Sequence, residues 1–365
     1  MPYIKIEAID TLFFKDGRPF SMGEETYATG IFPPPPSVFL GMLRSAYASE
    51  KNIPLDKIKE ETEHIKIEGV YYSADNDYYP IPLDLVRLKS LHEDENEAIS
   101  LFASNLQGLV SSSSKKLEYV LWHNEHIENI PNGMIDRKLF EYYLKDSRPM
   151  NFNWKYQPMS KLTKTEFKIG IGRNKQNKQS EDGKLYRVGM VRLQNNTSEH
   201  SLNFVIKTNI DNVGYLGKLG AEGKSVIFHN DEQFTPLNKI DYADNNHFRL
   251  YLNTPAFFEK GHIPNLKKHF PSWDFEIITY AVGKPLHIGG FDMAEKGGFP
   301  KSMMKAVPAG SVYYVKILNG TTKAFVESLE KNPVSSISDY RANEGFGLFY
   351  VGNLDMNKRI KSILW

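Results

Sequence analysis

The chain has 365 residues, of which 41% are hydrophobic and 24% are charged, so it can bury the cores of about two domains and is not disordered by composition. It contains no cysteine, which excludes disulfides, cysteine–zinc sites, iron–sulfur clusters and thiol nucleophiles and fits a cytoplasmic protein. The net charge is only +1, whereas a protein that coats nucleic acid is usually far more basic. A nucleic-acid site here would be a local patch or would be shared with partners.

The first half of the chain opens with a strand–helix–strand–strand pattern. The first strand alternates polar and apolar residues and has neither the basic start nor the apolar run of an export signal. Pro33–Pro36 interrupt the longest uncharged run and exclude a membrane helix there. Gly41, inside the predicted helix, suggests a close backbone approach. The elements expected in this half are a strand over residues 2–14, a helix from Pro36 or Ser37 to about Ser49, strands over 64–73 and 78–86, and a helix over 134–145.

A basic hairpin is expected in the middle of the chain. Residues 155–192 contain ten basic and three acidic residues. The two strands of the predicted hairpin are Phe167–Gly172 and Leu185–Leu193. A polar stretch over Asn238–Asn246 predicts a domain boundary. The elements expected after it are strands over 249–258, 275–282, 311–318 and 347–351, a short helix over 263–270 and a helix over 322–331.

This order repeats the pattern of the first half. We therefore expect an α+β fold with two ferredoxin-like (RRM-like, βαββαβ) domains, residues 1–242 and 243–365, the first carrying the basic arm at about 150–200.

Three glycine-rich segments are candidates for contact with phosphates. Gly220–Ser225 resembles the end of a P-loop, but Lys218 occupies the place of the first glycine, so a turn into a strand over 226–229 is expected instead. Gly345–Gly347, in the glycine-rich loop 345–352, fits either a tight turn or a backbone clamp on phosphates. The long passage 283–301 lies close to a lysine cluster that suits phosphates, Lys296, Lys301 and Lys305.

No catalytic or metal-binding constellation stands out. The spacing of His123 and His126 places two imidazoles near one helical face, but no third ligand is evident and a surface pair is the preferred interpretation. There is no Gly-x-Ser-x-Gly elbow and no paired carboxylate, and Asp10 and Asp16 look like turn or cap residues. We expect no catalytic residue, no metal and no cofactor.

The ordered set of motifs resembles a known family, the RAMP subunit three of the type III-B CRISPR effector, called the Cmr complex. The segments that carry the resemblance are Asp10–Phe20, Phe32–Ser37 with Gly41–Ser45, Leu219–Lys224, Thr254–Phe257, Lys301 with Val307–Val312, and Gly345–Gly347. The set spans residues 10–352, nearly the whole chain. One departure is Lys224, where the family usually has arginine, so the bidentate fork of a guanidinium is lost there.

The resemblance implies a non-catalytic subunit of a crRNA-guided complex for antiviral defence. It implies that the chain helps to hold the 5′ tag of the crRNA and lies beside the large polymerase-like subunit and a backbone RAMP subunit. It also implies that the basic arm acts against the guide–target duplex, so that target RNA is a further partner; no membrane is involved. The residues expected to bind RNA are Arg18, Ser37, Arg44, Lys224, Lys301, Arg341, Gly345 and Gly347. For Arg44 and Arg341 an ordinary surface ion pair is the alternative.

Two other functions remain open at this point. A RAMP endoribonuclease that processes crRNA would need a general acid or base, usually histidine near the first helix, and no histidine precedes His64. The equivalent crRNA-binding subunit of the type III-A complex is the other alternative.

Overall fold

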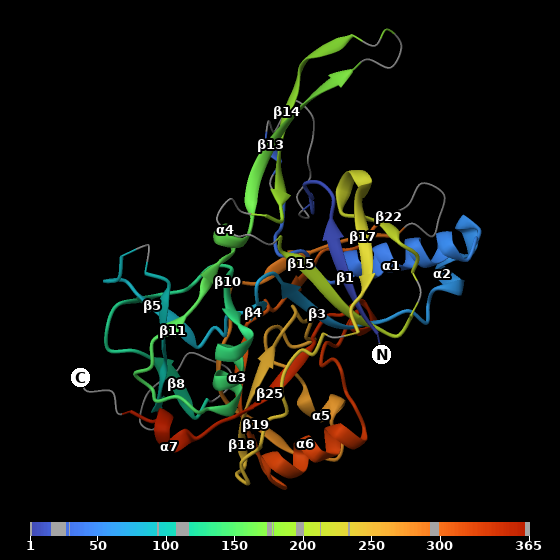
Figure 1. The fold of residues 1–365 in the computed structure, drawn as a ribbon. Helices are drawn as coiled ribbons and strands as arrows, with labels where there is room; N and C mark the ends of the chain where they lie inside the picture. Colours follow the sequence, from blue (N-terminus) through green and yellow to red (C-terminus); the bar gives the residue numbers. More distant parts are fainter. Residues whose placement is uncertain are drawn as a thin grey trace.

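A computed structural model describes residues 2–15, 27–28, 30–92, 95–106, 117–173, 177, 179–194, 201–211, 213–232, 234–292 and 299–361. Two antiparallel sheets make up its centre, and a long two-stranded arm stands away from the body (Figure 1). Within the described residues, no helix is long and apolar enough to cross a membrane.

The larger sheet has eight strands, all paired antiparallel. In spatial order they are β12 (Gln157–Pro158), β10 (Gly133–Asp136), β4 (Asp77–Pro80), β3 (Ile67–Ser73), β15 (Asn203–Thr208), β1 (Tyr3–Ala8), β17 (Lys224–Asn230) and β16 (Leu216–Leu219). The helix α1 (Ser37–Glu50) connects β1 to β3 and buries Phe39 and Leu43 against Ile4, Ile6 and Phe204 of the sheet. One face of this sheet is thereby covered.

The second sheet has four antiparallel strands. In spatial order they are β19 (Phe275–Ala281), β24 (Val312–Ile317), β18 (His247–Leu252) and β25 (Phe349–Asn353). A one-turn helix, α5 (Leu266–His269), lies between β18 and β19 in the chain, and α6 (Thr322–Lys331) lies between β24 and β25. If the four strands are numbered along the chain, with β18 as the first and β25 as the fourth, their order across the sheet is second, third, first and fourth. Numbered in the same way, β3, β15, β1 and β17 of the larger sheet follow the same order.

The two sheets share a buried layer, because alternate residues of each strand point to opposite faces. Tyr251 and Tyr314 of the second sheet join Val205 of the first in one cluster, together with Phe140 of α3 (Arg137–Lys145). Their neighbours in sequence, Leu250 among them, belong to a different cluster beside α5 and α6. The body is therefore layered as helix, sheet, shared core, sheet and helices.

The remaining strands form small ribbons around this body. These are β11 (Trp154–Lys155), β6 (Glu97–Ser100), β5 (Leu85–Leu88) and β9 (Ile127–Glu128) in one sheet; β7 (Phe102–Asn105) with β8 (Tyr119–Trp122); β20 (Leu286–Ile288) with β23 (Met304–Ala306); and β21 (Phe291–Asp292) with β22 (Phe299–Pro300). The other helical segments are α2 (Ile58–Glu61), α4 (Met159–Leu162), α7 (Met356–Arg359) and three 3₁₀ turns, η1 (Leu55–Lys57), η2 (Ala221–Gly223) and η3 (Ala342–Glu344).

The arm confirms the predicted hairpin and is longer than expected. It pairs β13 (Lys164–Arg173) with β14 (Ser180–Arg192), and β14 also pairs with the short β2 (Tyr27–Ala28). Figure 1 shows the arm projecting beyond every other element. It is the most prominent feature of the molecular surface.

Several predicted elements are confirmed and others are wrong in their extent. The helix over Thr322–Lys331 has the predicted bounds, because Thr321 caps it by accepting a hydrogen bond from the Ala324 N–H. The expected strand over 78–86 is wrong: β4 stops at Pro80 and β5 belongs to another sheet, since the two prolines around Ile81 cannot donate to a ladder. The helix expected over 134–145 begins too early. Residues 134–136 belong to β10, and α3 begins after Asp136, whose side chain caps it by accepting a hydrogen bond from the Leu139 N–H.

The expectation for Gly41 is also wrong. A Cβ built at this glycine would have no neighbour within 4 Å, and the residue is exposed. No close backbone approach therefore requires a glycine at this position of α1.

Candidate nucleic-acid interface

The segment that follows β1 anchors the base of the arm. Leu12 and Val191 exchange two backbone hydrogen bonds, each 2.7 Å long. Beside them, Phe13 packs against Val188 and Met190 of β14, and all three side chains are buried. The arm therefore leaves the body from a packed base, and this base adjoins the predicted site residue Lys224.

Asp10 lies at the centre of an ion-pair network at this base. Its carboxylate is 3.3 Å from Lys168 Nζ of β13 and 3.7 Å from Arg192 Nη2 of β14. Lys224 Nζ is 3.9 Å from the same carboxylate and 3.2 Å from Glu222. Lys224, expected to bind phosphate, is thus a paired cation with 18% of its side chain exposed.

The glycine-rich turn before β17 confirms the predicted turn into a strand. Gly220 and Gly223 have φ values of 76° and 56°, in the left-handed region that glycine adopts without strain. A Cβ at Gly220 would lie 2.6 Å from the carbonyl oxygen of Phe13, which accepts a hydrogen bond from the Ala221 N–H. The turn therefore packs against the same segment that anchors the arm.

The beginning of α1 places Ser37 and Arg44 two turns apart on the helix. Ser37 is its first residue, the first turn contains no acidic residue, and no side chain caps the end. The N–H groups of Val38 and Phe39 in this first turn donate to the carbonyls of Pro35 and Pro36 at 3.1 and 3.0 Å, so the dipole of the helix is what favours a negatively charged ligand at this end. Arg44 is half-buried, and its buried Nε has no hydrogen-bond partner among the residues that the structure describes.

Arg341 forms the ion pair that the sequence left as an alternative. Its guanidinium donates to Glu344 at 2.6 and 2.9 Å and to the carbonyl of Gly289 at 2.9 Å. Lys301 Nζ lies 3.2 Å from the same carboxylate. Burial acts to raise the pKa of Glu344, but Arg341 and Lys301 outweigh it and lower that pKa. Arg341 and Lys301 are therefore held together by one acid.

The glycines of the 345–347 turn approach protein groups closely. Gly345 has φ 88°, and a Cβ there would lie 2.7 Å from Ile67 Cγ2 and 3.1 Å from Pro36. Gly347 has φ 72°, and its Cβ would lie 2.5 Å from the backbone nitrogen of Ser338. The tight-turn interpretation is confirmed, and the turn lies against the start of α1.

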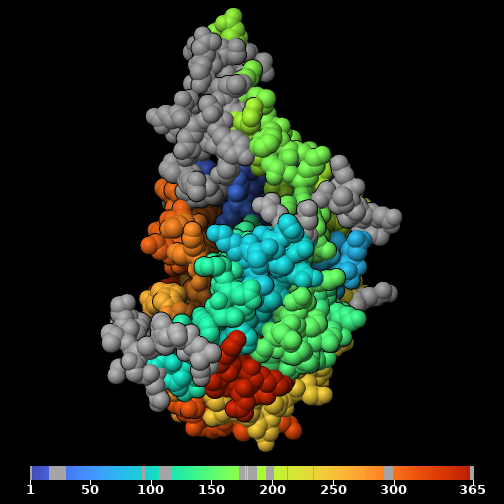
Figure 2. Space-filling model, turned by 90° about the vertical axis from the view of Figure 1, so that its left-hand side faces the viewer, coloured from blue at the N-terminus to red at the C-terminus, as the bar shows by residue number. Residues whose placement is uncertain are grey.

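Five of the predicted residues fall into two groups. Arg341 and Lys301 share Glu344, and the buried Gly345, which follows that acid, lies against Pro36, next to Ser37. Lys224 belongs to the network at the base of the arm. Phe14 lies between the two groups. Its ring is next to Gly220, and its centroid is 6.2 Å from the centroid of the Phe32 ring, in the segment that leads into α1. In Figure 2 the blue N-terminal segment is seen between the arm above and the orange segment near residue 300. Arg18 lies outside the described residues.

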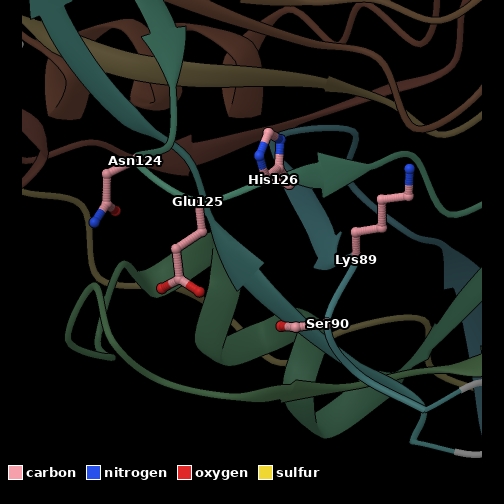
Figure 3. A pocket seen from close by; sticks show the side chains of 5 residues that line it. All are labelled: Lys89, Ser90, Asn124, Glu125 and His126. Atoms are coloured by element: carbon pink, nitrogen blue, oxygen red, sulfur yellow. The ribbon is translucent and has the colours of Figure 1, made fainter.

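The histidine pair does not form a helical metal site. His123 and His126 lie in the bend between β8 and β9, and His123 stacks on Phe102 at a centroid distance of 5.6 Å. His126 lines a shallow hollow of about 550 Å³ with Lys89 and Glu125, whose side chains fan out rather than converge (Figure 3). Among the residues described, no group of three His, Asp or Glu could hold a metal ion.

Sequence reasoning missed the acids that organise this face. The sequence indicates only a turn or cap residue at Asp10 and assigns no role to Glu222 and Glu344. The available signal was their position, since Asp10 and Glu222 lie inside motifs that also contain a predicted cation, Arg18 or Lys224, and Glu344 lies three residues after Arg341. Their pairing with Lys168 and Lys301 depends on contacts between distant parts of the chain.

Comparison with known proteins identifies the family. The family profile described as "CRISPR-associated protein (Cas_Cmr3)" matches residues 4–354. No curated protein matches the chain.

Similar chains occur among solved structures. One, titled "Cryo-EM structure of the Type III-B Cmr-beta bound to cognate target RNA and AMPPnP, state 1", is 15% identical, with 98% of each chain covered and a TM-score of 0.50. Another, titled "Cryo-EM structure of the Type III-B Cmr-beta bound to cognate target RNA", has the same identity and coverage and a TM-score of 0.45. At this identity the first likeness shows a shared fold. Because the family profile matches nearly the whole chain, this protein belongs to the Cas_Cmr3 family of CRISPR-associated proteins, and the expected membership in the subunits of the type III-B Cmr effector complex is confirmed.

Proposed function

We propose that this protein holds the 5′ tag of the crRNA within the Cmr effector complex and catalyses no reaction itself. In this proposal it also bridges the large polymerase-like subunit to the first backbone RAMP subunit. The observation that carries the proposal is the set of cations beneath the arm: Lys224 lies at the base of the arm, and Arg341 and Lys301 lie at the turn that packs against the start of α1. Cations of this kind position a protein on a sugar–phosphate chain.

The same proposal assigns two ferredoxin-like units to the chain, residues 1–242 and 243–365. The shared strand arrangement of second, third, first and fourth in both sheets supports it, as does the helix between the first and second strand of each. The second unit also has α6 between its third and fourth strands. In the first unit, β16 and η2 occupy that part of the described chain. The boundary falls in the stretch before β18.

We further assign the arm to the guide–target duplex. Lys164, Lys168, Arg187 and Arg192 lie along its described part, and it projects far from the body. The similar solved chain comes from a complex bound to target RNA, which supports RNA as the ligand of this fold.

Charge balance favours a shared RNA site. The whole chain has a net charge of +1, and Lys224, Lys301 and Arg341 each have an acidic partner. Phosphate binding must compete with these acids, so the isolated chain is expected to bind RNA weakly and with strong salt dependence. Affinity would come from grooves completed by neighbouring subunits.

Replacement of single lysines tests the proposal. In the assembled complex, Lys224→Ala should weaken retention of the crRNA tag and flatten the dependence of log affinity on log salt by about 0.7, the value for one lost phosphate contact to a single strand. Lys267→Ala is the matched control, because Lys267 lies on α5, far from the arm (Figure 1), and is likewise paired with an acid, Asp274. Equal affinity and equal salt slope for both variants would contradict the proposal.

The absence of catalysis needs its own measurement. The full chain incubated with repeat RNA, with and without divalent metal, should leave the RNA intact over hours. If the RNA is cut at one defined position, and this cleavage persists after further purification and in the presence of a chelator, the endoribonuclease alternative is supported instead.

A further inference from the structure

A β-ribbon of the C-terminal half, residues 284–306, forms a second projection with an unusual surface. Its base pairs β20 with β23, and its outer part pairs β21 with β22. Ile288 and Ala306 bury the base in a small core with Phe257 and Phe346. The described ribbon is therefore a packed element of the fold and not a loose loop.

Two phenylalanines of the outer ribbon are largely exposed to solvent. Phe291 is 54% exposed and Phe299 is 55% exposed. Phe291 lies opposite Pro300, and Phe299 lies opposite Asp292, so the two rings are on opposite faces of the ribbon. Neither ring contributes to a hydrophobic cluster in the described part of the protein. Each ring therefore offers a largely uncovered aromatic surface to a ligand.

The ribbon that carries these rings is also cationic. Its described residues include Lys284, Lys301 and Lys305 against a single acid, Asp292. Lys305 lies opposite His287, and both are exposed. Lys284 and Lys305 have no acidic partner among the residues that the structure describes. Positive charge beside exposed rings fits an anionic ligand that also has flat apolar faces.

Unpaired RNA has this combination of groups. Bases stack on aromatic rings regardless of sequence, and phosphates lie within reach of lysine side chains. The ribbon also adjoins the candidate face, because Lys301 and the carbonyl of Gly289 contact Glu344 and Arg341 respectively. In Figure 2 the orange segment near residue 300 lies below the base of the arm.

We propose that Phe291 and Phe299 stack on unpaired RNA bases, one on each face of the ribbon, while Lys305 neutralises an adjacent phosphate. This inference rests on the proposed function, because it names the base contacts of the same RNA-binding face. It adds contacts with the bases to a face whose other candidate contacts are cations that are paired with acids.

Substitutions that separate stacking from apolar contact test it. In the full chain at low salt, Phe299→Leu and Phe291→Leu should each weaken binding of an eight-nucleotide single-stranded RNA by about 5- to 150-fold, measured by fluorescence anisotropy. Phe299→Trp should bind as the wild type does, because it keeps an aromatic face. Tyr215→Leu is the matched control, since Tyr215, just before β16, is an aromatic residue that is 63% exposed. An RNA with abasic sugars should bind the wild type and the leucine variants equally.

Three other outcomes would contradict either the stacking proposal or the proposed function. If the leucine variants bind the normal RNA as tightly as the wild type does, the stacking proposal is wrong while the proposed function stands. If they retain RNA affinity but lose association with other subunits of the complex, the ribbon is a protein-docking surface and the proposal is likewise wrong. If the wild type binds no RNA, alone or in the assembled complex, the proposed function itself fails.

Discussion

Replacing Asp146 with asparagine should destabilise the fold strongly. Asp146 ends α3, and its Oδ1 lies 2.5 Å from Arg249 of β18 and 2.5 Å from Arg359 of α7. The two arginine side chains are only 0% and 3% exposed. Asparagine removes the charge that lies between them and leaves two cations close together inside the protein. Breaking a buried ion pair from one side costs about 3–5 kcal/mol.

Thermal unfolding measures this effect. With an unfolding entropy of about 2.1 cal/mol/K per residue, a chain of 365 residues that unfolds cooperatively should lose about 4 to 6 °C in Tm. The matched control is Asp274→Asn, which breaks a pair with Lys267 whose side chains are 52% and 56% exposed. That loss should stay below about 1 kcal/mol. The reasoning is refuted if both variants unfold at the same temperature.

The same carboxylate predicts a pH dependence. Burial acts to raise the pKa of Asp146, but Arg249 and Arg359 outweigh it and lower that pKa to about 2. An unfolded aspartate has a pKa of about 3.9, so the stabilisation is present above pH ~4 and is lost as the pH falls from there through 2. The wild type and Asp146→Asn should therefore converge in stability toward pH ~2. A constant difference across this range would contradict the assignment.

Two further substitutions, Gly347→Ala and Asp10→Asn, test the packing of the candidate face, and Gly41→Ala serves as a comparison for the first. Gly347→Ala should lower Tm, because its Cβ would lie 2.5 Å from the Ser338 nitrogen at a φ of 72°, whereas Gly41→Ala, with no neighbour within 4 Å, should stabilise α1 by about 0.5–1 kcal/mol. Equal shifts of the same sign would show that the turn is not tightly packed. Asp10→Asn should speed hydrogen exchange at the base of the arm, in β13 and β14, and leave α6 unchanged. Unchanged exchange in the arm would show that Leu12 and Phe13 hold it without the ion pairs.

Local patterns predicted the elements whose signals are local. Helix α6 and the arm were anticipated from helical spacing and from alternation around a basic tip. Strands whose two faces are both buried, such as β24, were predicted from continuous runs of apolar residues. The break between β4 and β5 was missed because a strand pattern continues through the prolines around Ile81, and only the sheet to which each part pairs separates them.

The candidate site was predictable in residue type but not in partners. Glycine at 220, 345 and 347 pointed correctly to turns. The ion pairs of Lys224 and Lys301 with Asp10 and Glu344 join residues 214 and 43 positions apart, and no short-range pattern encodes them. The burial of Arg249 could not be predicted from its strand, because its partner Asp146 is supplied by the other half of the chain.

The most direct test of the account is to map the guide RNA on this subunit. A crRNA with 4-thiouridine in its 5′ tag would be assembled into the complete complex and crosslinked by light, and the attached peptides would be identified by mass spectrometry. The account predicts crosslinks to the turn at 220–224, to the ribbon at 284–306 and to the turn at 341–347. Crosslinks from the tag that reach only other subunits would contradict it.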